Sequence, residues 1–287
     1  MDLHQLCADM ISVAKEAGDI ARTAQPTTGT IATKKNTTDI VTETDKAAEA
    51  LIRERLTTRY GSFDFRGEES HEAASELTDR PTFIVDPIDG TSNFVHGLPD
   101  VCVSISVVVS RSPTVGVVYN PFTDELWTAI KDHGAFYSRN GGPTEKLPLK
   151  AAAPLDLSSA CVAIEWGSDR EGPAFDLNLH VFTMLARTER TNGKFVNSLR
   201  CTGSAAITIC RVAAGQQDAF WECGSWEWDV AAAWCILVEA GGIMVDGHPT
   251  GNWNPPVDNR RYLAVRAANS GQERFVEEFW AVIRSGM

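Results

Sequence analysis

The 287-residue chain is short of positive charge, because 26 Lys and Arg residues face 38 Asp and Glu residues and the formal net charge is −12. This balance argues against nucleic acid as a partner, since phosphate backbones are bound by basic surfaces. No apolar run approaches the roughly 20 residues that span a bilayer. The N-terminus also lacks the basic and continuously apolar regions of a secretory signal. The seven cysteines are scattered and without CxxC spacing, which fits reduced thiols. We therefore expect a cytoplasmic protein that binds neither membrane nor nucleic acid.

Hydrophobic periodicity predicts two halves that meet near the Pro- and Ala-rich stretch 148–154. In residues 1–150 the pattern predicts helices over about 3–24 and 45–60, a polar loop over 27–38, and strands over 83–85, 101–109, 115–119, 125–130 and 135–138. In residues 151–287 it predicts strands near 160–165, 218–222, 243–246 and 262–266, alternating with helices near 172–190, 203–214, 229–240 and 270–284. An antiparallel α+β half followed by an α/β half is the expected organisation.

The segment 82–94 carries the strongest chemical signal. Its apolar start, Phe83 to Val85, predicts a strand limited by Pro87, and Gly90 with the residues after it favours the start of a helix. Asp86 and Asp89 lie between them. A helix N-terminus favours a phosphate group, and Mg²⁺ would bridge that phosphate to the two carboxylates. The alternative is a strand end in which both aspartates accept only backbone hydrogen bonds.

Further carboxylates are ambiguous when each is considered alone. Glu68 and Glu69 follow Gly67, and adjacent glutamates most often form a solvated turn. Asp229 begins an apolar helix, where an aspartate is favoured by the helix dipole. No Ser/His/Asp or Cys/His arrangement for a nucleophile is apparent. Only the order of the acidic motifs along the chain distinguishes a shared site from isolated turn and helix-start residues.

That order resembles the inositol monophosphatase family of Mg²⁺-dependent, lithium-sensitive phosphatases. Residues 86–94, Asp-Pro-Ile-Asp-Gly-Thr-Ser-Asn-Phe, are similar to its first signature, and residues 228–233, Trp-Asp-Val-Ala-Ala-Ala, to its second. Residues 67–70, Gly-Glu-Glu-Ser, resemble its acidic metal-site motif. The resemblance implies a layered α-β-α-β-α sandwich of the inositol monophosphatase and fructose-1,6-bisphosphatase type. It also implies a site between the halves, lithium inhibition and a homodimer.

The resemblance implies two or three Mg²⁺ ions per site. The first would be held by Glu68, Asp86 and the backbone carbonyl of Ile88, and the second by Asp86, Asp89 and Asp229. Thr91, paired with Asp45, would orient and help to deprotonate the attacking water, and the choice between this pair and Glu68 as the base stays open.

Substrate contacts are implied for residues of both halves. Glu222, seven residues before Asp229, matches a carboxylate that binds inositol hydroxyls. Trp226 and Glu227 depart from the family pattern and leave the exact sugar alcohol open. Lys34 matches a lysine near the site or is simply solvated, and His96 is expected to be structural. The full set of implied substrate contacts is Asp89, Gly90, Thr91, Ser168, Ser204, Ala205 and Glu222.

The expected reaction is hydrolysis of inositol monophosphates to inositol and phosphate by direct attack of water. Related enzymes with the same metal core act on histidinol phosphate, fructose bisphosphate or 3′-phosphoadenosine nucleotides. A non-catalytic protein-binding role is the alternative from a different class.

Overall fold

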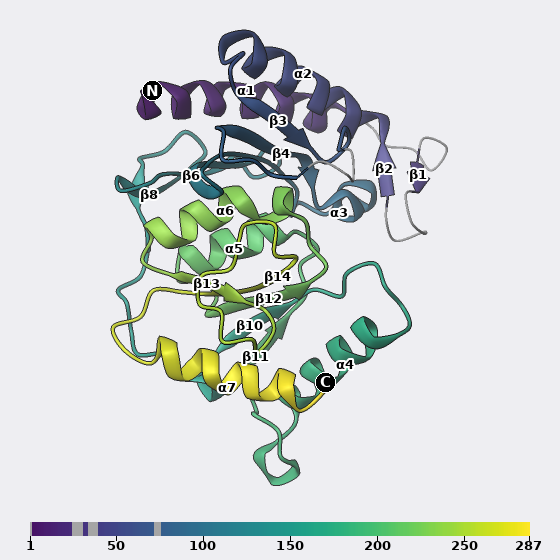
Figure 1. Cartoon of the computed structure of the whole chain (residues 1–287), viewed down its shortest axis with the longest axis vertical. Coiled ribbons are helices and arrows are strands. Elements are labelled where there is room, and N and C mark those ends of the chain that lie inside the picture. The colour runs from purple at the N-terminus through teal and green to yellow at the C-terminus, as the bar shows by residue number, and fades with distance from the viewer. Residues whose placement is uncertain (1, 25–30, 34–39, 72–75) are drawn as a thin grey trace.

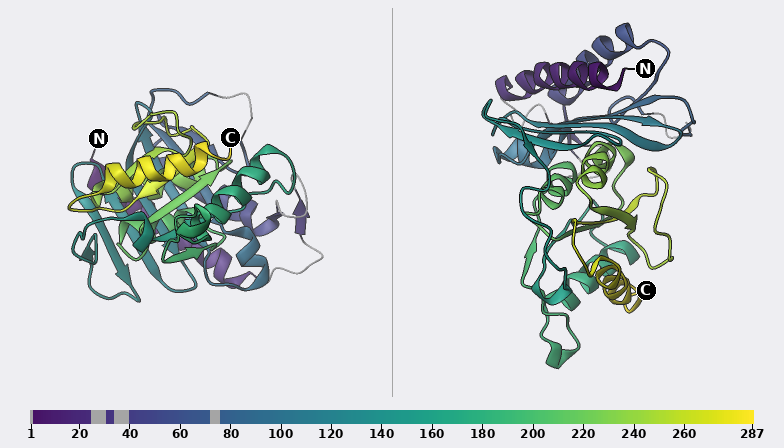
Figure 2. Two further views of the ribbon diagram at one scale, coloured as in Figure 1. Left: turned by 90° about the horizontal axis from the view of Figure 1, so that it is seen from below. Right: turned by 90° about the vertical axis from the view of Figure 1, so that its left-hand side faces the viewer.

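The computed structural model describes residues 2–24, 31–33, 40–71 and 76–287, and their helices and sheets alternate in layers (Figures 1 and 2). The layered α-β-α-β-α fold expected from the resemblance is confirmed. The helices are α1 (Leu3–Thr23), α2 (Glu43–Arg59), α3 (Thr91–His96), α4 (Pro173–Ala186), α5 (Ala205–Ala213), α6 (Glu227–Glu239) and α7 (Gln272–Arg284).

A seven-stranded sheet has the order β3-β4-β5-β6-β7-β8-β9. Its β3–β4 pair is parallel and the remaining pairs are antiparallel, as the predicted meander requires. Its strands are β3 (Asp64–Gly67), β4 (Thr82–Asp89), β5 (Cys102–Val109), β6 (Ser112–Asn120), β7 (Glu125–Ile130), β8 (Gly134–Arg139) and β9 (Glu145–Lys146). Helices α1 and α2 cover one face, because Leu6, Met10 and Val13 recur on one side of α1 and are buried.

A five-stranded sheet has the order β11-β10-β12-β14-β13, with β10 parallel to β11 and β12, and β14 antiparallel to β12 and β13. Its strands are β10 (Cys161–Ile164), β11 (Ser198–Arg200), β12 (Ala219–Cys223), β13 (Ile243–Asp246) and β14 (Arg261–Val265). The core on its far face joins Trp221 of the sheet to Val181 of α4 and Phe279 of α7. Figure 2 shows these two helices as the outermost layer.

Helices α5 and α6 lie between the two sheets (Figure 2). Helix α6 belongs to the second half in sequence but packs on β4, β5 and β6 of the first. Small residues allow this close approach: a Cβ atom added at Gly116 of β6 would lie 2.2 Å from the Ala232 carbonyl oxygen. The start of α6 is therefore held at the seven-stranded sheet.

The structure differs from the sequence predictions in three short strands that were not predicted, β3, β9 and β11, and at two further places. The strand predicted to stop before Pro87 continues as β4 to Asp89, and its pairing with β5 shifts register between Asp86 and Asp89. A proline has no N–H to donate, so a strand accommodates it where the ladder is already interrupted. The loop predicted over 27–38 was also wrong in part, because β1 (Ile31–Thr33) pairs with β2 (Ile40–Thr42).

The division near residue 150 falls between β9 and β10, which belong to different sheets. Helix α6 nevertheless packs across this division. The assignment of two separate halves, residues 1–150 and 151–287, stays a prediction. In the part of the chain that the structure describes, no helix has the length and apolar character needed to cross a membrane.

Candidate metal centre

Three aspartates meet where β4 ends and α6 begins. Asp86, Asp89 and Asp229 each place one carboxylate oxygen so that all three oxygens lie within 4.8 Å of one another. The first two flank Pro87 in the irregular part of β4, and Asp229 lies in the first turn of α6. The strand irregularity and the packing of α6 together produce the cluster.

Asp86 and Asp89 are buried, Asp229 is partly buried, and the charges of the three carboxylates repel one another. Asp86 is 2% exposed and Asp89 is 6% exposed. Burial, followed by the charges of Glu68, Asp89 and Asp229, raises the pKa of Asp86 well above its usual range. Burial also raises the pKa of Asp89 to about 6, and that of Asp229 well above its ordinary value. Among the described residues no Lys or Arg forms an ion pair with any of the three. A set of crowded carboxylate oxygens is suited to hard divalent cations such as Mg²⁺.

Hydrogen bonds orient the aspartates. Asp89 Oδ2 accepts from the Ser204 hydroxyl and from Ala206 N at 2.9 Å, and Asp229 Oδ2 accepts from Trp226 N at 2.6 Å. Asp86 Oδ1 accepts from Ile88 N at 3.0 Å. The backbone-bonded turn expected as the alternative is thus present, but it orients the carboxylates within the cluster rather than replacing it.

Glu68 approaches the cluster from the end of β3. Its backbone N–H donates to the Val85 carbonyl at 3.1 Å, and its side chain raises the pKa of Asp86 through charge and a hydrogen bond. Its carboxylate is outside the group defined by 4.8 Å. The turn depends on Glu49, which sequence reasoning missed: buried Glu49 Oε2 accepts from Glu69 N at 2.7 Å. A Cβ atom at Gly67 would lie 2.3 Å from that oxygen, so a larger residue there would displace the Glu49 carboxylate.

Thr91 and Asp45 meet as the resemblance implied. Thr91 Oγ1 lies 3.4 Å from Asp45 Oδ1 and 3.1 Å from the Ile88 carbonyl oxygen, and it has one proton to donate. Asp45 is 1% exposed. Next to Thr91, Gly90 has φ +92°, and a Cβ there would lie 2.6 Å from the Asp100 carbonyl oxygen. Only glycine fits this approach of the chain.

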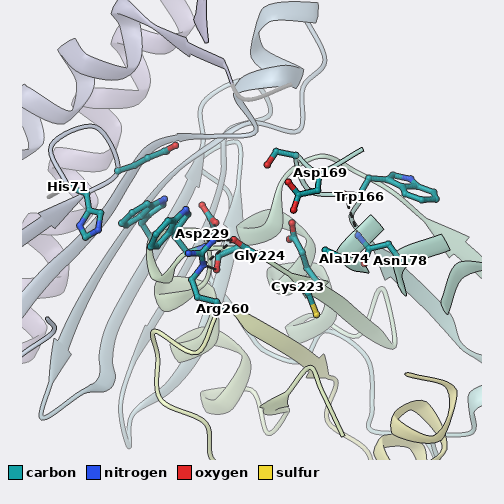
Figure 3. Close-up of a pocket in the computed structure, with 16 residues that line it drawn as sticks. His71, Trp166, Asp169, Ala174, Asn178, Cys223, Gly224, Asp229 and Arg260 are labelled. Carbon is teal, nitrogen blue, oxygen red and sulfur yellow. Dashed lines mark hydrogen bonds between the residues drawn. The ribbon is translucent and has the colours of Figure 1, made fainter. Parts of the chain in front are cut away.

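Two adjoining pockets share Glu222 and Asp229 in their walls. One has a volume of about 580 Å³ and is also lined by Glu68 and Ser168 (Figure 3). The other has a volume of about 540 Å³ and is also lined by Asp89, Ser204 and Ala205. The Ser204 hydroxyl is already engaged by Asp89, which leaves the backbone of this segment for a substrate. Of the expected substrate contacts, Asp89, Ser168, Ser204, Ala205 and Glu222 therefore border these two pockets, whereas Gly90 and Thr91 are not among their lining residues.

Glu222 is held in an unusual electrostatic environment. Burial and then the charge of Glu165 raise the pKa of Glu222 to about 8. Glu165, which sequence reasoning missed, accepts hydrogen bonds from Thr202 N at 2.7 Å and Gly203 N at 3.0 Å and so fixes the loop before α5. No local motif marks Glu165, because its partners lie almost forty residues later in the chain.

Trp226 and Glu227, which depart from the family pattern, contact further residues around the site. Trp226 stacks on Trp228 with ring centroids 5.1 Å apart, and the Arg260 guanidinium lies 3.4 Å from the Trp226 ring centroid. Buried Glu227 forms an ion pair with Arg66 at 2.8 Å. Figure 3 shows His71 on one side of Asp229, Trp166 and Asn178 on the other, and Arg260 below Asp229 in that view.

His96 and Lys34 are two further residues that the sequence singled out. His96 Nδ1 lies 2.8 Å from the Ser92 carbonyl oxygen, a local contact within its own helix, and the residue also borders the second pocket. Lys34 lies outside the described residues.

Comparisons with known proteins agree with this geometry. Residues 2–284 match the model of the inositol monophosphatase family. The chain is 46% identical over 253 residues to inositol monophosphatase 2 of Saccharomyces cerevisiae, covering 86% of this chain and 83% of the relative. It is 44% identical to inositol monophosphatase 2 of Solanum lycopersicum, covering 84% and 86%. The solved structure of an IMPase from Thermotoga maritima is similar, with TM-score 0.77, 26% identity and 100% coverage of both chains. The chain belongs to the inositol monophosphatase family.

Proposed function

We propose that this protein hydrolyses inositol monophosphates to inositol and inorganic phosphate, with divalent metal ions and without a covalent phospho-enzyme. The observation that carries the proposal is the group of buried Asp86 and Asp89 and partly buried Asp229, with oxygens within 4.8 Å of one another. Its family membership, with relatives named inositol monophosphatases, supports the substrate.

The residues present fit the metal. Glu68, Asp86, Asp89, Asp229 and the Ile88 carbonyl would hold two or three Mg²⁺ ions, all through oxygen. When bound there, Mg²⁺ supplies positive charge to the phosphoryl group and makes water a stronger acid. Burial and mutual repulsion raise the pKa values of Asp86 and Asp229. Bound cations would offset this repulsion and favour the ionised carboxylates, which supports the assignment of a metal site.

Proton movement falls to the pair of Thr91 and Asp45. The 3.4 Å separation of Thr91 Oγ1 and Asp45 Oδ1 allows the hydroxyl to turn toward the carboxylate and pass on a proton from water. The competing acceptor of this hydroxyl is the Ile88 carbonyl oxygen, at 3.1 Å. Glu68 is the alternative base.

The alcohol part of the substrate would lie against the wall formed by Glu222. A carboxylate that accepts two vicinal hydroxyls discriminates against alcohols that leave its charge unpaired. Ser168 and the backbone at Ser204 and Ala205 add polar contacts along the same walls. Asp89 and the N–H groups of Gly90 and Thr91 would complete the phosphate end.

Assembly, inhibition and location are proposed by analogy with the family and from the composition. A homodimer and inhibition by lithium are proposed on the strength of family membership. Residence in the cytoplasm stays a prediction from the sequence.

A substrate panel tests the proposal. Inositol 1-phosphate, histidinol phosphate, fructose 1,6-bisphosphate and 3′-phosphoadenosine 5′-phosphate are compared by phosphate release, with Mg²⁺ and with EDTA. We expect the highest kcat/KM for inositol 1-phosphate and no turnover in EDTA. A higher kcat/KM for another substrate, or turnover that ignores EDTA, would contradict the proposal. Cellular function retained by Asp89→Asn would favour the protein-binding alternative.

A further inference from the structure

The larger pocket carries one cation that the proposed chemistry does not use. Glu68, Asp169, Glu222 and Asp229 make its lining strongly acidic. Arg260 is the only Lys or Arg among its described lining residues. In the view of Figure 3 it lies below Asp229.

Arg260 is held rigidly from two directions. Its Nε donates to the carbonyl oxygens of Gly224 at 3.1 Å and Ser225 at 3.0 Å, and its Nη2 donates to that of Gly224 at 2.5 Å. Its guanidinium lies against Trp226, which in turn stacks on Trp228. The orientation of the guanidinium plane is therefore set before any substrate arrives.

The charge of Arg260 is not matched by an acid. Within the described part of the chain it forms no ion pair, and its hydrogen-bond acceptors are neutral carbonyl groups. An aromatic face stabilises a cation more weakly than a carboxylate or phosphate does. Nη1 takes part in none of these hydrogen bonds and is left as a donor toward a ligand.

We propose that Arg260 binds a second anionic group, a carboxylate or phosphate carried by the alcohol part of the phosphomonoester. A negative charge placed at this position then strengthens binding relative to a neutral group of the same size, while inositol monophosphates stay the preferred substrates. This inference rests on the proposed phosphatase function and adds a second class of phosphomonoester that the same site binds. A role limited to holding the loop from Cys223 to Trp226 is the rival explanation.

Competition kinetics separate the two explanations. Glucuronic acid 1-phosphate and glucose 1-phosphate differ only in a carboxylate that replaces a CH₂OH group. Each is used as an inhibitor of inositol 1-phosphate hydrolysis at saturating Mg²⁺. We expect the wild-type inhibition constant to be about tenfold lower for the glucuronic acid ester, as one charge-assisted hydrogen bond provides. Arg260→Gln, which keeps N–H donors for the loop, is expected to bring the ratio of the two constants to about one.

Arg274→Gln is the matched control, because it removes one positive charge from exposed α7, where Arg274 pairs with Glu278 at 2.7 Å. Its ratio should equal that of the wild type. Equal constants in the wild type overturn the inference, as does an Arg260→Gln variant that weakens both inhibitors equally, the signature of a loop-holding role. Either result with intact inositol 1-phosphate hydrolysis leaves the proposed function standing. A wild type that hydrolyses no phosphomonoester overturns both.

Discussion

The Ser204 hydroxyl donates a hydrogen bond to Asp89 Oδ2, although 115 residues separate the two in sequence. Ser204 is also the N-cap of α5, where its Oγ accepts from Ile207 N at 3.3 Å. One side chain from the second half thus caps a helix and orients a candidate metal ligand from the first. The geometry of the centre therefore depends on contact between segments from both sides of residue 150.

Replacing Ser204 by Ala removes both contacts. We expect a loss of about 1 kcal/mol in the free energy of unfolding from the missing cap. The Mg²⁺ concentration for half-maximal activity should rise about tenfold, as for other groups that orient metal ligands. Urea unfolding and Mg²⁺ titration of activity measure the two effects.

The matched control is Asp2→Ala, which removes the N-cap of α1, where Asp2 accepts from His4 N and Gln5 N. It should lower stability without changing the Mg²⁺ requirement. If both variants shifted the Mg²⁺ requirement alike, the link between Ser204 and the metal would be disproved.

Asp89→Asn keeps the shape of the side chain and removes its charge. Since Asp89 is a candidate metal ligand, we expect kcat at saturating Mg²⁺ to fall at least about 100-fold. The melting temperature of the metal-free protein should not fall, because the repulsion between Asp89 and the neighbouring buried carboxylate of Asp86 is removed. Asp79→Asn, at a side chain that is 80% exposed, is the control. Near wild-type turnover would refute the assigned role.

The buried pair of Arg66 and Glu227 links β3 to α6, and each partner lies two residues before a candidate metal ligand, Glu68 or Asp229. Glu227→Gln removes the ion pair that Glu227 forms with Arg66, so we expect a loss of about 3 kcal/mol in the free energy of unfolding. A double-mutant cycle with Arg66→Met measures the coupling. The exposed pair of Arg55 and Glu16, at 3.1 Å, should couple by less than about 1 kcal/mol. Equal coupling in both pairs would contradict the structural assignment.

Glu222 gives the metal-free protein a pH-dependent stability. Its pKa is about 8 in the folded protein against an ordinary value of 4.5, so between these values the folded state holds a proton that the unfolded state has lost. The stabilisation is complete below the lower value and is lost as pH rises toward 8. This group alone contributes a slope of up to about −1.4 kcal/mol per pH unit to the free energy of unfolding.

Urea unfolding in EDTA between about pH 5 and about pH 8 measures this slope, with the wild type compared to Glu222→Gln. The variant cannot ionise at this position, and its slope should be smaller. Identical slopes would show that Glu222 ionises normally.

Much of the fold could be predicted from residue patterns. The amphipathic spacing of α1 and the alternation in β5 to β8 produced elements close to their observed bounds, because local periodicity reflects which face is buried. The pattern failed at Pro87, where β4 continues through a register shift, and at 31–33, where a short strand pairs with 40–42. Both features depend on neighbouring strands that a local pattern does not contain.

The sequence by itself determined the acidic motifs, their order and the residue types that suit Mg²⁺, because these are written in continuous stretches around Glu68, Asp86 and Asp229. Only the tertiary structure decided that three aspartate oxygens meet within 4.8 Å, that Ser204 and Glu49 hold their surroundings, and that Arg260 faces the pocket. The physical reason is that these contacts join residues far apart in the chain. They exist only once α6 has packed between the two sheets.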